Sequence, residues 1–98
     1  MTGVELIAKE RQEQIEKHGR TVEYDVFINK SMQLSEAAAS LIHPDISTPR
    51  KRFSVMPTNW DDGLSLRMCK KQYLERLVIS GALIAAEIDR VLYLSEKQ

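Results

Sequence analysis

The stretch LVISGALIAAEIDR, residues 77–90, decides the fold of this 98-residue chain. Its large apolar side chains recur at helical spacing, and Tyr73 and Val91 extend the same stripe at either end. Such a stripe indicates a long amphipathic helix, which we expect to begin between residues 64 and 69 and to end at Leu94. Further apolar residues make the face wider than two short partner helices would cover. We therefore expect this helix to pack both within the chain and against another copy.

Gly81 stands in the middle of this expected helix. Glycine inside a helix costs about 1 kcal/mol relative to alanine, so its presence needs a reason. The pattern predicts that another part of the backbone approaches closely at this point.

Two shorter helices are predicted upstream. Thr2 and Glu5 form a capping-box pattern at the start of the first helix. Gly19 marks its end, because glycine readily takes the left-handed conformation that follows a helix. Residues 19–25 are expected to connect it to an alanine-rich second helix, from about Val26 to Ile42.

Residues 44–63 are predicted to form a long loop, since they hold all three prolines of the chain. A loop of this length in a small domain is usually functional or disordered. Residues 1–98 are thus expected to form a single all-α domain, a small helical bundle of about three helices. A domain this short buries little apolar surface alone, so we expect a homo-oligomer, either a dimer or a tetramer, to complete the bundle.

The composition excludes several classes of protein. Fourteen basic residues balance fourteen acidic ones, so no overall field attracts nucleic acid or a membrane surface. The single cysteine, Cys69, excludes an internal disulfide and a cysteine-rich zinc site. No apolar run reaches the roughly 18–20 residues that span a bilayer, and the N-terminus lacks the pattern of a secretory signal. These features predict a cytoplasmic protein without membrane or nucleic-acid partners.

Three blocks occur in a particular order along the chain. They are ERQEQI at residues 10–15 with the segment 19–25, the alanine-rich helix around Glu36, and residues 77–90, with Trp60 and Asp61 before the last block. Taken together, these blocks resemble small phage and bacterial relatives of the all-α NTP pyrophosphohydrolase (MazG-like) superfamily. The resemblance covers most of the chain and leaves out mainly the loop.

The resemblance implies a hydrolase that cleaves a nucleoside triphosphate to a monophosphate and pyrophosphate. In that superfamily an ExxE pair on one helix and an ExxD pair on the next hold Mg²⁺, or Mn²⁺, which bridges to the substrate phosphates. In this sequence the first pair falls on Gln33 and Glu36, and the second on Arg76 and Ile79. Glu36 is therefore the one acid among the four positions. A shift of one residue brings Glu75 into the second pair.

Other side chains are candidates to complete such a site. Glu36 is the predicted catalytic residue and metal ligand, with Glu10, Glu13 and Glu87 as further oxygen ligands. The predicted substrate-binding residues are Arg67 and Lys70, which would meet phosphate charge, together with Trp60 and Asp61. Each has a structural alternative: the glutamates could make helix-surface ion pairs, and Trp60 could pack in the core or an interface.

The missing acids leave a second reading open. The chain would then be a non-catalytic helical oligomer that acts as a nucleotide-binding or protein-interaction module. Three or more carboxylates converging on one cavity would favour the enzyme, whereas Glu36 alone would favour the non-catalytic module.

Overall fold

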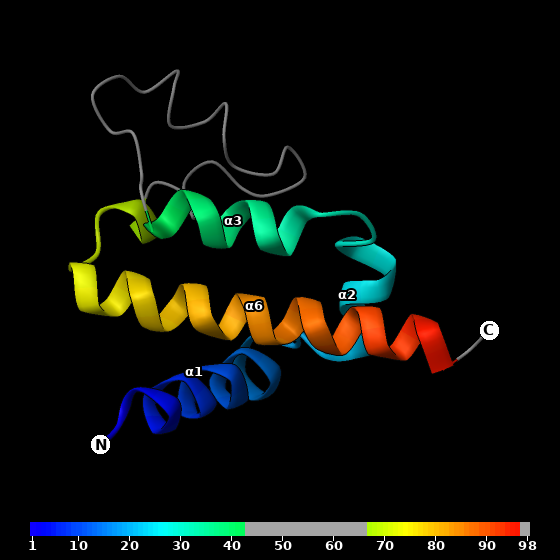
Figure 1. The fold of residues 1–98 in the computed structure, drawn as a ribbon, viewed down its shortest axis with the longest axis horizontal. Coiled ribbons are helices and arrows are strands. Elements are labelled where there is room, and N and C mark those ends of the chain that lie inside the picture. The colour runs from blue at the N-terminus through cyan, green and yellow to red at the C-terminus, as the bar shows by residue number, and fades with distance from the viewer. Residues whose placement is uncertain (43–66, 97–98) are drawn as a thin grey trace.

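The computed structural model of the chain describes residues 1–42 and 67–96 (Figure 1). The helices in these ranges are α1 (Gly3–His18), α2 (Val22–Ile28), α3 (Gln33–Ile42) and α6 (Tyr73–Glu96). Residues 67–69 are also helical, and the described ranges contain no strand. The predicted all-α fold with one long C-terminal helix is thus confirmed. The expected loop at 44–63, with Trp60 and Asp61, lies outside the described residues.

The predicted caps of α1 are confirmed. The Thr2 hydroxyl accepts a hydrogen bond from the backbone N–H of Glu5, and the Glu5 carboxylate accepts one from the N–H of Thr2. At the other end, Gly19 has a φ of 65°, in the left-handed region. These local hydrogen bonds satisfy backbone groups that a helix end leaves free, which is why sequence alone located both ends.

The prediction of one helix from Val26 to Ile42 is wrong, because this region forms α2 and α3. Helix α2 begins earlier than expected, since the Thr21 hydroxyl caps it by accepting from the N–H of Tyr24. It ends at Ile28 with Asn29 as its C-cap, and residues 29–32 separate it from α3. Asn29 donates a side-chain hydrogen bond to Asp25, and asparagine at a helix end favours such local bonds over continuation of the helix.

The last helix begins later than expected. Residues 70–72 interrupt the backbone between the helical residues 67–69 and α6. The Arg76 side chain stabilises this corner, since its Nε donates to the carbonyl of Lys71 at 3.0 Å. Its Nη1 also donates to the carbonyl of Leu41 at 2.9 Å, at the end of α3. Arg76 thus caps one helix and ties it to the start of another.

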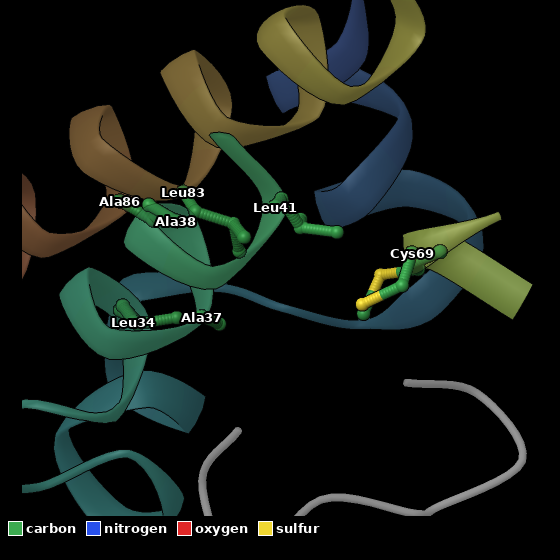
Figure 2. Packing of buried hydrophobic residues seen from close by; sticks show 8 residues of the cluster. Leu34, Ala37, Ala38, Leu41, Cys69, Leu83 and Ala86 are labelled. Carbon is green, nitrogen blue, oxygen red and sulfur yellow. The ribbon is translucent and has the colours of Figure 1, made fainter. Parts of the chain in front are cut away.

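Helix α6 is the centre of the fold, because α1, α2 and α3 each pack against it (Figure 1). The core that α3 and α6 share with the helical residues 67–69 combines leucine and methionine with small side chains (Figure 2). Its buried residues are Leu34, Ala37, Ala38, Leu41, Met68, Cys69, Leu83 and Ala86. Small residues let the two helices come close enough for the Ser80 hydroxyl to donate to the Ala38 carbonyl at 3.0 Å. Cys69 is buried in this core.

A close approach occurs at Gly81, but it is made by the side chain of Ile7 and not by another backbone segment as predicted. A Cβ atom at this position would lie 2.6 Å from Cδ1 of Ile7 on α1. The absent side chain is therefore what lets α1 cross α6 at this distance.

Among the described residues, no helix is long and apolar enough to cross a membrane.

Candidate functional site

A cavity of about 580 Å³ lies where α1 passes the beginning of α6. Its apolar lining comes from Leu6, Met68, Leu74, Val78 and Ile79. Its polar lining consists of Glu10, Glu13, Gln14, His18, Arg20, Arg67, Lys71 and Glu75. Ligand pockets commonly have volumes of roughly 300–1,000 Å³ and combine apolar walls with a few polar groups. The cavity has the size and chemical character of a small-molecule site.

Two carboxylates of the cavity come from one face of α1. Glu10 and Glu13 are separated by three residues, which places their side chains on the same side of the helix. Burial raises the pKa of Glu10, and the negative charge of Glu13 raises it further. A hydrogen bond from Gln14 and the charges of Lys71 and His18 lower it less. A cation beside Glu10 would offset both effects that raise its pKa.

Positive charge faces this pair across the cavity. Arg67 and Lys71 come from the segment before α6, and Arg20 comes from the connector after α1. Lys71 pairs with Glu75, with 3.7 Å between Nζ and Oε2. This ion pair is solvent-exposed and therefore contributes little to stability, so the lysine remains available to a more highly charged ligand. Phosphate groups are ligands that such side chains recognise.

Arg20 is brought to the cavity by its backbone. Its N–H donates to the carbonyl of Gln14 at 3.0 Å, and its carbonyl accepts from Nη1 of Arg11 at 2.8 Å. Arg11 is buried, with 8% of its surface exposed. Two hydrogen bonds thus hold the connector to α1, and they fix the position of the Arg20 backbone beside the cavity.

A buried polar cluster lies behind the connector, at the junction of α1, α2 and α6. Asp25 is fully buried and accepts a hydrogen bond from Asn29 at 2.9 Å through Oδ1, whereas its Oδ2 has no hydrogen-bond partner among the residues that the structure describes. Burial raises the pKa of Asp25, against the opposing effects of Asn29 and of the Arg11 and Arg20 charges. The nearby charge of Glu87 raises it slightly more.

Glu87 forms a paired contact with Arg90 on the same helix. The Arg90 guanidinium donates from Nε and Nη2 to the two carboxylate oxygens, the second at 3.1 Å. The hydrogen bonds that Arg90 donates to Glu87 raise the pKa of Arg90, and Arg90 Nη1 also donates to the carbonyl of Lys30. Glu87 is therefore engaged in an interior ion pair, away from the residues that line the cavity.

The predicted site residues divide into two groups. The structure brings Glu10, Glu13 and Arg67 together around the cavity. Glu36 is exposed on α3 and does not line the cavity. Lys70 is also exposed and outside the lining, whereas its neighbour Lys71 lines the cavity. The positions that align with the superfamily acids cap helices or fill the core: Gln33 accepts from the N–H of Ser31, Arg76 caps α3, and Ile79 packs on the core.

Four ionisable lining residues were not among the predicted site residues: His18, Arg20, Lys71 and Glu75. The sequence did point to Glu75, because shifting the alignment with the superfamily by one residue places Glu75 in the second acidic pair. Lys71 neighbours the predicted Lys70, but only the turn at residues 70–72 decides which lysine faces the cavity. Nothing in the sequence pattern marks Arg20, because its position depends on a tertiary hydrogen bond.

The fit of a divalent metal depends on how many ligands the protein must supply. Among the residues that the structure describes, no three His, Cys, Asp or Glu side chains are grouped to hold a metal ion. Mg²⁺ in nucleotide sites is nevertheless often bound by one or two carboxylates together with substrate phosphates and water. Glu10 and Glu13 fit this second arrangement, in which the nucleotide brings most of the metal's ligands.

The sequence matches no known protein family, and neither curated proteins nor solved structures provide a significant match.

Proposed function

We propose that the cavity binds a nucleoside triphosphate and that the chain is a MazG-like nucleotide pyrophosphohydrolase. The observation that carries the proposal is that the carboxylate pair of Glu10 and Glu13 lines the same cavity as the cationic side chains of Arg67, Lys71 and Arg20. A triphosphate with a bound divalent cation carries both kinds of charge and is complementary to such a lining. The apolar wall formed by Leu74, Val78 and neighbouring residues suits the nucleobase.

The basic and acidic residues of the cavity have different roles in this proposal. Arg67 and Lys71 bind phosphate oxygens and orient the chain of phosphates. Glu10 and Glu13 would hold Mg²⁺ or Mn²⁺, which would polarise the phosphoryl group and neutralise developing charge. Burial raises the pKa of Glu10, so its carboxylate is a stronger base toward a water in the cavity than an ordinary glutamate. Water then displaces pyrophosphate from the α-phosphorus and leaves the nucleoside monophosphate.

A non-catalytic nucleotide-binding module is the second candidate. The observation that favours it is that the described residues hold no ready-made group of three metal ligands. In this case the cavity would bind the triphosphate and leave it intact. In both forms of the proposal, the chain forms a homo-oligomer, either a dimer or a tetramer, in the cytoplasm.

The test is to incubate the purified chain with Mg²⁺ or Mn²⁺ and a panel of ribo- and deoxyribonucleoside triphosphates, and to separate the products by chromatography. The enzyme produces monophosphate and pyrophosphate in equal amounts, and EDTA abolishes both. Saturable binding without product would select the non-catalytic module. Neither binding nor product would reject the cavity as a nucleotide site.

A further inference from the structure

One face of α6 leaves large apolar side chains in solvent. Exposure ranges from 37% for Leu77 to 57% for Tyr73. The set, here called the α6 face, consists of Tyr73, Leu77, Ile84, Ile88, Val91 and Leu92. The opposite side of the same helix buries mainly small residues, such as Ala82 and Ala86. The helix therefore turns its smaller side chains inward and its larger ones outward.

The α6 face is a continuous strip between two packed neighbours. Ser80 faces α3, to which it donates a hydrogen bond, and Gly81 faces Ile7 of α1. At about 100° per residue, five of the six members project between these two directions, within a sector of roughly 60°. The strip contains no charged side chain. Leu77, Ile84 and Val91 recur at intervals of seven, the repeat with which helices pack on one another.

We propose that the α6 face is the surface through which two copies of this chain associate, with the two α6 helices antiparallel. This refines the homo-oligomer of the proposed function and requires nothing of the nucleotide chemistry. A two-fold interface uses the same patch on both subunits, and an uncharged strip is complementary to itself.

The exposed area of the α6 face is consistent with an interface between two copies of the chain. From their exposed fractions, the six side chains present on the order of 500 Å², against about 800 Å² per partner in a standard interface. Because α1 and α3 flank the strip, they can supply the remaining area. A patch of this size is at the upper end of what monomeric proteins leave exposed.

Helix dipoles, and not side-chain charges, favour the antiparallel orientation. The side-chain charges at both ends of α6 are mixed, since Glu75 pairs with Lys71 in the first turn and Lys97 follows Glu96 in the sequence. The helix dipoles supply the preference, because they oppose one another favourably when the two helices are antiparallel.

The mass of the full-length chain in solution tests the proposal, measured by sedimentation equilibrium over a concentration series. We expect a particle of twice the 11.2 kDa chain mass, or a tetramer of such pairs. Ile84→Lys should raise the dissociation constant of the pair at least about 30-fold, as loss of a central hot-spot residue does. Phe27→Lys is the matched control, because it introduces the same charge at an exposed apolar residue on α2. Circular dichroism checks that both variants stay helical.

A monomer at all concentrations would overturn the proposal, as would an oligomer whose mass Ile84→Lys leaves unchanged. A monomer whose α6 amides are protected from exchange by residues 43–66 would also overturn it, because the chain itself would then cover the face. Oxidative cross-linking tests the orientation. Ile84→Cys lies near the two-fold axis and should link to its counterpart, whereas a Tyr73→Cys link would contradict antiparallel pairing.

Discussion

Arg11 donates a hydrogen bond from its buried guanidinium to the backbone carbonyl of Arg20, at 2.8 Å, nine residues along the chain. The contact crosses the connector between α1 and α2 and places Arg20 at the cavity. The same guanidinium supplies positive charge beside the fully buried Asp25. One side chain thus links the helix junction with the proposed phosphate site.

Replacing Arg11 by methionine should lower the free energy of unfolding by about 2–4 kcal/mol. The change removes the hydrogen bond to Arg20 and leaves Asp25 with less compensating charge. Urea denaturation measures the loss, and Lys9→Met, on an exposed position of the same helix, is the control. Equal stability of the two variants would show that the Arg11 contact contributes nothing.

Asp25 predicts a pH dependence whose sign follows from its burial. Because burial raises its pKa, the folded chain keeps this proton to a higher pH than the unfolded chain. Stability therefore falls as pH rises from the ordinary titration range of an aspartate through the raised value, and recovers as pH falls. The substitution Asp25→Asn removes the contribution of this carboxyl group to the pH dependence. The pKa of Glu10 is also raised, but Glu10 is present in both proteins, so its contribution cancels when the two are compared. The unfolding free energy of the wild type relative to Asp25→Asn should decrease with pH in this window. A constant or increasing difference would contradict the assignment.

Gly81 and Ile7 predict a coupled pair of substitutions. Gly81→Ala alone should destabilise the chain by about 1–2 kcal/mol, since overpacking outweighs the gain in helix propensity. In an Ile7→Ala background the added methyl has room, and the same substitution should stabilise by up to about 1 kcal/mol. A double-mutant cycle from denaturation curves measures this change of sign. Additive effects would mean that α1 does not approach α6 at this point.

Local chemistry explains which parts of the fold the sequence could predict. The caps of α1 at Thr2 and Gly19 depend on neighbours in the chain, and the spacing of the apolar residues in α6 depends on the helix alone. The break between α2 and α3 was missed, because the helical spacing of the apolar residues continues across residues 29–32, where the backbone leaves the helix after Asn29 caps α2. Arg76 stands where the resemblance places an acid, and only the structure shows that it caps α3.

The candidate site depends on contacts between distant segments. Glu10 and Glu13 could be selected from their spacing on one helix, but their cationic counterparts come from elsewhere in the chain. Lys70 and Lys71 are adjacent residues of the same type, so the sequence does not show which of them lines the cavity. The turn before α6 decides this. The sequence therefore indicated the acids and not the arrangement of charge around them.

These adjacent lysines make a sharp test of phosphate binding. Lys71→Ala should weaken the binding of a triphosphate about tenfold, the cost of one charge-assisted hydrogen bond. Lys70→Ala removes the same charge from the next residue, outside the cavity lining, and should change the dissociation constant less than about twofold. Calorimetric titration at fixed ionic strength compares the two. A larger effect at Lys70 would place the phosphates elsewhere.

The most direct measurement is metal-dependent triphosphate hydrolysis by Glu10→Gln, Glu13→Gln and Glu36→Gln beside the wild type. Our account predicts that the wild type releases pyrophosphate, and that either substitution in the cavity lowers kcat at least about 100-fold. Glu36→Gln, on the exposed side of α3, should retain most of the activity. Pyrophosphate release that depends on Glu36 and survives the loss of Glu10 and Glu13 would contradict the account.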